Sequence, residues 1–179
     1  MLVFNEEKHE YLVDGERLPS VTEIINSFLA PFQWDMSRGR AVHKACQYYD
    51  EGDLDEDTLD VEVIPYFEGY KKFKSEHEII WEAIEKPVYH RVFRYAGTPD
   101  RWGMIDGTRT LLDLKSGSVP PFAKYQLAGY ADMLDYNLER RVLFLLPYRY
   151  KLMLPFTDHR DIQGFRSMIT VFNILKTMR

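Results

Sequence analysis

Hydrophobic and polar residues alternate in the N-terminal segment "VFNEEKHEYLVDGERLPS", and Asp14–Gly15 lies within it. A period of two is typical of strands, and Asp-Gly is a strong signal for a tight hairpin turn. The pattern therefore predicts an N-terminal β-hairpin. Ser20 and Glu23 follow at the spacing of a capping box, which predicts that a helix begins there.

Two further segments show helical periodicity before residue 79. From Ser37 to Tyr49, apolar residues recur at Val42, Ala45, Cys46 and Tyr49 and predict one core stripe. Another helix is predicted after the proline of "VEVIPYFEGYKKFKSEH". Between the two lies "DEGDLDEDTLD", which lacks the glycine that a calcium-binding loop requires and is interpreted as a solvated linker.

Residues 79–105 are rich in β-branched and aromatic side chains and predict strands. "MIDGTRTLLDLK" predicts a second hairpin, which turns at Asp106–Gly107. "PFAKYQLAGYADMLDYN" has the pattern of a helix. "RRVLFLLPY" is a continuous apolar strand of the kind buried on both faces of a sheet, and "YRYKLMLP" is a candidate for one more strand. A terminal helix is expected from Asp158.

The order of these elements is hairpin, helices, three strands, helix, strand and helix. A strand–helix–strand passage after a hairpin predicts a mixed sheet with a right-handed crossover. The expected fold class is therefore α/β (α+β), with a central mixed sheet flanked by helices. The length of 179 residues fits one domain. We divide it into an N-terminal hairpin and helix (1–36), a core (37–157) and a C-terminal helix (158–179).

Composition excludes several classes of protein. Cys46 is the sole cysteine, so an internal disulfide, a cysteine-ligated zinc site and an iron–sulfur cluster are all excluded within one chain. The formal net charge of −5 argues against tight coating by nucleic acid over the whole surface. No apolar run approaches the ~20 residues that span a bilayer, and the N-terminus lacks the layout of a signal peptide. We expect an intracellular protein that does not engage a membrane.

The stretch "TLLDLKSGS" places two charges in an otherwise apolar strand. Side chains alternate between the faces of a strand, so Leu112 and Leu114 share one face and Asp113 and Lys115 share the other. Burying charges costs several kcal/mol each unless they are paired or bind a metal. Taken alone, this pair favours the interpretation of a plain ion pair at a sheet edge.

A second carboxylate is expected near Asp113. The hairpin that turns at Asp106–Gly107 folds the end of "AGTPD", with Asp100, against the strand of Asp113. Two carboxylates held close together repel each other unless a cation lies between them. Oxygen ligands of this kind suit Mg²⁺ or Mn²⁺.

Two predicted helices carry further polar candidates. In "GRAVH", His43 flanks the apolar stripe and is either a candidate ligand or a packed core histidine. In "YQLAGY", Gln126 and Tyr130 are four residues apart and share a helix face. Tyr130 is also compatible with an ordinary core tyrosine. Gln126 has apolar neighbours, so its amide is expected to face a polar group inside the fold.

The four motifs "GRAVH", "AGTPD", "LLDLKSG" and "QLAGY" occur in this order. Together they resemble the RecB-like branch of the PD-(D/E)XK nuclease superfamily, over roughly half of the chain. The N-terminal segment "FNEEKHEYLVDGERLPSVTEII" is also similar to small phage and prophage exonucleases of that branch. The resemblance implies a restriction-endonuclease-like core.

The resemblance also implies roles for individual residues. His43, Asp100, Asp113 and the Leu114 carbonyl would be metal ligands. Lys115 would be the catalytic lysine and would act with the two carboxylates, Gln126 and Tyr130. Glu85 is a candidate further acid or a solvent-facing strand residue. The candidates for contact with DNA are Arg91, Arg94, Arg101, Lys124 and Tyr125.

These roles imply a hydrolase that cleaves phosphodiester bonds in DNA with Mg²⁺ or Mn²⁺. We expect an exonuclease rather than an endonuclease, acting on single strands or duplex ends in the cytoplasm during phage or bacterial recombination and repair. The chain lacks a G-x-x-x-x-G-K-[ST] loop, so ATP-driven unwinding would need a helicase or recombination partner. Two alternatives stay open: a nucleic-acid-binding module of the same fold without turnover, and an unrelated enzyme in which D-x-K is only an ion pair.

Overall fold

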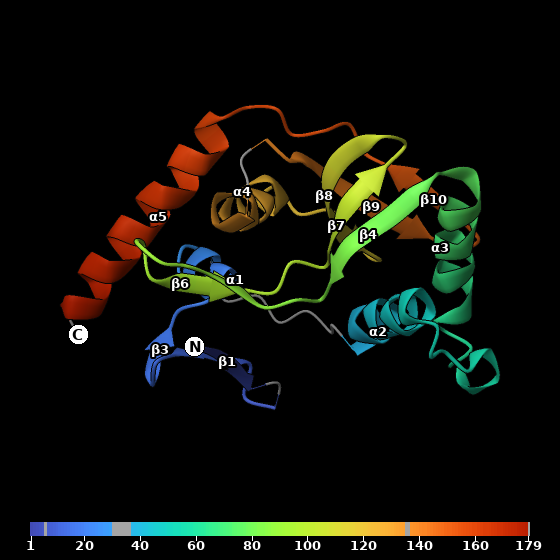
Figure 1. Ribbon diagram of the computed structural model, residues 1–179, viewed down its shortest axis with the longest axis horizontal. Helices are drawn as coiled ribbons and strands as arrows, with labels where there is room; N and C mark the ends of the chain where they lie inside the picture. The colour runs from blue at the N-terminus through green and yellow to red at the C-terminus, as the bar shows by residue number, and fades with distance from the viewer. Residues whose placement is uncertain (6, 30–36, 135–136, 179) are drawn as a thin grey trace.

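The computed structural model describes residues 1–5, 7–29, 37–134 and 137–178. Its centre is a five-stranded sheet in the order β10-β9-β8-β7-β4, with helices on both faces (Figure 1). The strands, in chain order, are β4 (Ile79–Ile84), β7 (Arg101–Ile105), β8 (Thr108–Lys115), β9 (Glu139–Leu146) and β10 (Arg149–Leu152). The predicted α/β class with a central mixed sheet is confirmed.

The sheet is mixed because its strands are connected in two different ways. β7 and β8 form the predicted antiparallel hairpin, whose turn residues Asp106 and Gly107 have φ angles of 49° and 75°. β8 and β9 are parallel, and the helix α4 (Ala123–Leu134) lies between them in the chain. The strand–helix–strand passage expected from the sequence is therefore present.

A three-stranded sheet forms the N-terminal part of the molecule. Its strands are β1 (Leu2–Asn5), β2 (Glu10–Val13) and β3 (Glu16–Leu18), and β2 and β3 form the hairpin predicted at Asp14–Gly15. Helix α1 (Val21–Asn26) follows, and the backbone N–H of Glu23 donates a hydrogen bond of 2.9 Å to Ser20 Oγ. This contact confirms the predicted N-terminal cap.

Residues 79–115 form five strands rather than the expected three. β4 ends at Ile84, and the chain then leaves the central sheet through Glu85, which has a φ angle of 43°. It forms a separate two-stranded sheet, β5 (Val88–His90) and β6 (Tyr95–Gly97), before it re-enters the central sheet as β7. The aromatic-rich pattern is the same for both sheets, so it does not reveal where one ends.

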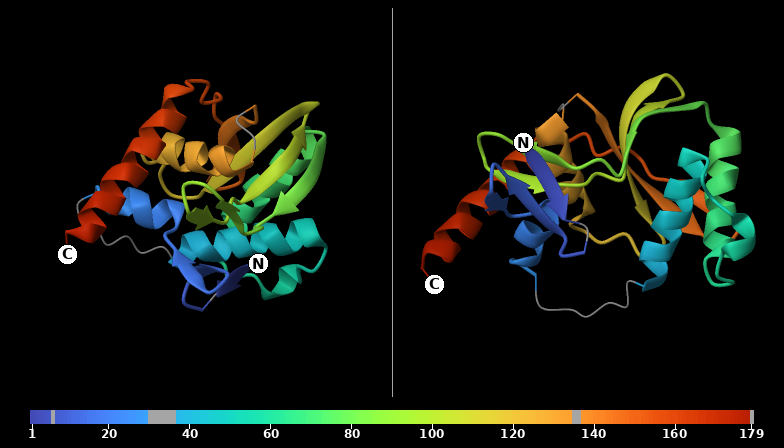
Figure 2. Two further views of the ribbon diagram at one scale, coloured as in Figure 1. Left: turned by 60° about the vertical axis from the view of Figure 1, so that its left-hand side comes forward. Right: turned by 60° about the horizontal axis from the view of Figure 1, so that its bottom comes forward.

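The two faces of the central sheet carry different helices (Figure 2). α2 (Ser37–Glu51) and α3 (Ile64–Glu76) cover one face, where Leu112 and Leu114 join their apolar residues in one core. α4 covers the other face, with α1 and α5 (Arg160–Thr177) packed against it, and Leu111 belongs to this second core. The predicted alternation of faces along β8 is confirmed.

The acidic segment between α2 and α3 differs in part from the prediction. It contains a short 3₁₀ helix, η1 (Glu56–Thr58), and much of it is exposed. Its first residue, Asp50, lies instead in the last turn of α2, and the Asp50 side chain is fully buried. Asp50 is therefore an internal charge and not part of a solvated linker.

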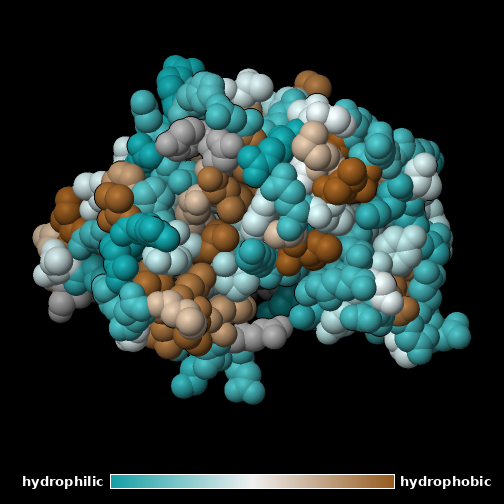
Figure 3. Space-filling model, viewed as in Figure 1, coloured by the Kyte–Doolittle hydropathy of each residue, from teal (hydrophilic) through white to brown (hydrophobic). Residues whose placement is uncertain are grey.

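The C-terminal half of α5 is largely exposed, including Val171, Ile174 and Leu175. Figure 3 shows more hydrophobic surface on the left, where α5 and the N-terminal strands lie, than at the right-hand edge beside α3. None of the described helices combines the length and apolar composition needed to cross a bilayer.

Candidate metal centre and active site

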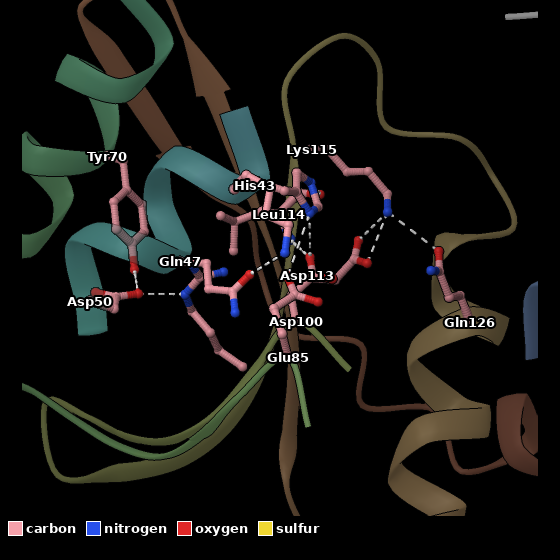
Figure 4. A network of polar contacts seen from close by, with 12 residues as sticks. His43, Gln47, Asp50, Tyr70, Glu85, Asp100, Asp113, Leu114, Lys115 and Gln126 are labelled. Atoms are coloured by element: carbon pink, nitrogen blue, oxygen red, sulfur yellow. Dashed lines mark hydrogen bonds and ion pairs between the residues drawn. The ribbon is translucent and has the colours of Figure 1, made fainter. Parts of the chain in front are cut away.

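Three potential metal ligands converge at one end of the central sheet. They are His43 from α2, Glu85 just after β4 and Asp100 just before β7, and one ligand atom from each lies within 4.8 Å of the others. Figure 4 shows these side chains pointing toward one another. Strand pairing places the two acids together, because Ile84 of β4 is opposite Arg101 of β7. The Glu85 N–H also donates a 2.8 Å hydrogen bond to the Asp100 carbonyl.

The surroundings of His43 determine which ring nitrogen carries a proton. His43 Nε2 lies 2.9 Å from the Leu114 carbonyl oxygen, which can only accept, so Nε2 is the donor. Burial lowers the pKa of His43 and so favours the neutral ring. The negative charge of Asp100 opposes this effect but does not outweigh it. Nδ1 then presents a lone pair at 3.6 Å from Asp100 Oδ2 and 4.0 Å from Glu85 Oε1.

The two carboxylates of this cluster receive little compensation from protein donors. Asp100 Oδ2 accepts one hydrogen bond of 2.6 Å from the Leu114 N–H. Burial and the Asp100 charge raise the pKa of Glu85 well above its ordinary value. Two acids and an imidazole lone pair that face one another form a site with excess negative potential, and such a site favours a cation.

A second set of polar residues lies beside this cluster and comes from β8 and α4. Lys115 Nζ is 2.8 Å from Asp113 Oδ1 and 2.7 Å from Asp113 Oδ2. It also donates to Gln126 Oε1 at 3.4 Å (Figure 4). Gln126 Nε2 in turn donates to the Tyr130 hydroxyl at 3.4 Å. The structure therefore joins all four predicted residues in one chain of contacts.

Charge determines the protonation of this second set. Burial alone would lower the pKa of Lys115, but the Asp113 and Asp100 charges outweigh it, and the pKa is raised. The lysine is therefore an ammonium ion. The pKa of Asp113 is raised to about 6. Burial is the main cause and the Asp100 charge adds to it, while the Lys115 charge opposes it. The Asp113 carboxylate is paired with Lys115. It is therefore separate from the cluster of His43, Glu85 and Asp100.

Close packing fixes Tyr130 at the edge of the site. A Cβ atom on Gly97 of β6 would lie 2.6 Å from Tyr130 Cε1 and 3.3 Å from Val21 Cγ2. Contacts under 3.0 Å between carbon atoms are far inside van der Waals separation, so residue 97 must lack a side chain for the ring to pack there. The Tyr130 hydroxyl is thereby directed toward Gln126.

Arg101 is not accessible to DNA. Its side chain is fully buried and Nε lies 2.7 Å from Asp50 Oδ2, so the predicted contact between Arg101 and DNA is wrong. The strand pattern showed that Arg101 lies next to Asp100 but could not show which face it occupies. Asp50, its partner, was missed because its segment has the composition of a linker.

The other four candidates for DNA contact are exposed or partly buried, and within the described part of the chain no hydrogen bond or ion pair joins them to the cluster. Arg91 is exposed and Arg94 pairs with Glu16 at the tip of the β5–β6 hairpin. This tip lies against α5, because Phe93 there is covered by the Arg166 guanidinium at 4.9 Å. Lys124 lies 3.5 Å from Asp161 and 4.7 Å from the centre of the Tyr125 ring.

Comparison of the chain with known proteins found no family model that matches it and no curated protein that matches it. A function for the chain must therefore be argued from its residues and their arrangement.

Proposed function

We propose that this protein is a divalent-metal-dependent nuclease that hydrolyses phosphodiester bonds in DNA, with exonuclease action favoured. One observation carries the proposal: the His43–Glu85–Asp100 cluster and the Asp113–Lys115–Gln126 contacts occur at the same end of β7 and β8. The order of the motifs supports the same conclusion, because they resemble RecB-like PD-(D/E)XK nucleases.

The residues present fit a divalent cation. His43 Nδ1 and the carboxylates of Glu85 and Asp100 would hold it, with Asp113 adjacent. Carboxylate oxygens suit Mg²⁺ and Mn²⁺. When bound, the cation supplies positive charge that polarises a phosphate group and makes water more acidic.

The residues of the second set would position and stabilise the reacting groups. Asp113 and Gln126 hold the Lys115 ammonium from two sides, which limits its rotation. An ammonium so fixed can donate a hydrogen bond to a phosphate oxygen as negative charge develops there. Tyr130, held by Gly97, orients Gln126 in turn.

A cellular role in phage or bacterial recombination and repair is part of this proposal. DNA single strands or duplex ends would be the substrate. A helicase or recombination protein would supply any unwinding, since the chain lacks the P-loop sequence of an ATPase.

The test is cleavage of end-labelled single- and double-stranded DNA with Mg²⁺, Mn²⁺ or EDTA. We expect wild-type protein to cut with either metal and to release mononucleotides, and EDTA to stop it. Lys151→Ala is the matched lysine control, because Lys151 lies on β10 and is exposed. Absence of cutting on every substrate would refute the proposal and leave DNA binding without turnover to be measured by titration.

A further inference from the structure

Behind the proposed metal cluster lies a buried ion pair that takes no direct part in it. Arg101 Nε donates to Asp50 Oδ2 at 2.7 Å, and both side chains are fully buried. The Tyr70 hydroxyl donates to the same Asp50 oxygen, and the Arg101 guanidinium lies 5.2 Å from the centre of the Tyr70 ring. Figure 4 shows Asp50 and Tyr70 at one end of α2 and His43 nearer the other.

This arrangement is incomplete as a hydrogen-bonded unit. Among the described residues, neither Nη1 nor Nη2 of Arg101 has a hydrogen-bond partner, although both are buried. A buried arginine with two unsatisfied nitrogens is costly, and replacing such pairs by apolar residues often stabilises a protein. Stability alone therefore does not explain this pair, whereas specification of a register is a well-attested use of buried polar groups.

The positions of the two partners suggest which register is set. Asp50 and His43 are seven residues apart on α2, which corresponds to about 10 Å along a helix and nearly the same face. Their partners, Arg101 and Asp100, are consecutive in the chain. Two points of α2 are thus attached to one short segment at the start of β7.

Besides these two points, α2 is held by the hydrogen bond from His43 to the Leu114 carbonyl and by ring contacts of Tyr49 with Phe67 and Tyr70. Its buried residues are Val42, Ala45 and Cys46, which are small and apolar. Apolar packing is non-directional, so these small side chains specify the position of the helix less sharply than a buried ion pair does. A shift of a single residue would move His43 by about 1.5 Å along the helix axis. Metal ligation tolerates about 0.2 Å.

We propose that Arg101 is a positioning residue, and that its ion pair with Asp50 sets the register of α2 against β7 so that His43 faces Asp100 and Glu85. This inference rests on the proposed function only for its consequence, metal binding. The register itself is a property of the protein without metal.

The test compares Arg101→Met with Arg140→Met. In each variant a buried arginine is lost while its aspartate keeps a lysine: Asp50 keeps Lys74 at 3.0 Å, and Asp161 keeps Lys124 at 3.5 Å. Both arginines have buried guanidinium nitrogens without hydrogen-bond partners in the described part of the chain. Arg140 lies on β9 and pairs with α5, away from α2.

Two quantities are measured on folded protein: the NMR signal of the His43 Nε2–H that bonds Leu114, and the Kd for Mn²⁺ by calorimetry. We expect Arg101→Met to shift or broaden the His43 signal and to weaken Mn²⁺ binding at least tenfold. Arg140→Met should leave the signal in place and the Kd within twofold. Loss of a positive charge by itself would tighten Mn²⁺ binding. Weaker binding by Arg101→Met would therefore point to a changed helix register and not to the lost charge.

Arg101→Lys retains a cation for Asp50 and should recover part of both readouts. If Arg101→Met does not fold, Arg101→Lys alone tests the inference. The His43 signal should then shift from its wild-type position, and Mn²⁺ binding should weaken. An unchanged His43 signal, tighter Mn²⁺ binding, or an equal effect of Arg140→Met would overturn the inference. If wild-type protein neither binds Mn²⁺ nor cuts DNA, the proposed function fails, and the His43 signal still tests the register.

Discussion

The two halves of the candidate site differ in how their charges are balanced. In the half formed by Asp113, Lys115 and Gln126, an ammonium lies against a carboxylate and an amide oxygen, so charge is paired within the protein, although Asp113 Oδ2 has no hydrogen-bond partner among the described residues. In the half formed by His43, Glu85 and Asp100, lone pairs of like character face one another. In the first half opposite charges are paired, whereas in the second half two acids and an imidazole lone pair face one another. Variants of the two halves should therefore behave differently.

The largest effect is expected for Asp100→Asn in the cluster. Removing this charge should abolish measurable Mn²⁺ binding and reduce cleavage about 10³-fold or more, since a bound metal contributes several kcal/mol to catalysis. Stability should be kept or raised, because the asparagine oxygen can still accept from the Leu114 N–H and a repulsion is removed. Calorimetry measures the Mn²⁺ binding, a cleavage assay measures the activity, and thermal unfolding measures the stability. Intact Mn²⁺ binding would contradict the assignment of Asp100.

Lys115→Ala is expected to have the next largest effect and to separate catalysis from metal binding. Cleavage should fall about 10²- to 10³-fold, as for loss of one group that stabilises developing charge. Mn²⁺ binding should persist, because His43, Glu85 and Asp100 stay in place. Single-turnover cleavage at saturating Mn²⁺ is the measurement, with Lys151→Ala alongside. Cleavage at the wild-type rate would show that Lys115 forms only an ion pair.

Gly97→Ala should disturb the first half indirectly. The added Cβ would lie 2.6 Å from the Tyr130 ring, so the free energy of unfolding should fall by about 1–3 kcal/mol, as in overpacked cores. Displacement of Tyr130 should loosen Gln126 and lower kcat more than it changes metal affinity. Gly117→Ala is the matched control, because an added Cβ there meets nothing within 4 Å. Equal unfolding midpoints in urea for the two variants would contradict the packing argument.

The smallest effect concerns pH and belongs to the second half. Burial and Asp100 raise the folded-state pKa of Glu85 above the ordinary 4.5, so the folded protein binds more protons than the unfolded chain above that pH. Its contribution to stability is therefore present below the unfolded pKa and declines as pH rises toward the folded one. Urea unfolding at several pH values should show this decline, and Glu85→Gln or added Mn²⁺ should reduce it. The prediction would be contradicted if, between the unfolded and the folded pKa of Glu85, the wild-type protein gained stability with rising pH relative to Glu85→Gln.

Much of the fold could be predicted because its determinants are local. The Asp-Gly turns, the cap at Ser20 and the apolar stripe of α2 each depend on residues within one or two turns of chain, and all three are present. The strand count between residues 79 and 115 was wrong, because both sheets select the same aromatic and β-branched residues. Composition shows that a segment is extended but not which sheet it joins.

The candidate site was predictable to a similar degree. Asp113 and Lys115 were found because charges in an apolar strand are conspicuous, and the hairpin register placed Asp100 beside them. For Glu85 the sequence left two roles open, a further acid of the site or a solvent-facing strand residue. The turn that brings Glu85 into the cluster, with a φ angle of 43°, is not evident from the sequence. The roles of Asp50 and Arg101 were missed, since both look like ordinary surface charges in the sequence.

The sequence by itself determined the class of fold and the faces of β8, because period and turn chemistry are properties of neighbouring residues. Only the tertiary structure decided which charges face one another. The His43 ring nitrogen that bears the proton depends on the Leu114 carbonyl, 71 positions away. Arg101 is an internal cation because it meets Asp50 in the core, 51 positions away. Such pairings follow from how whole elements pack, which no local pattern encodes.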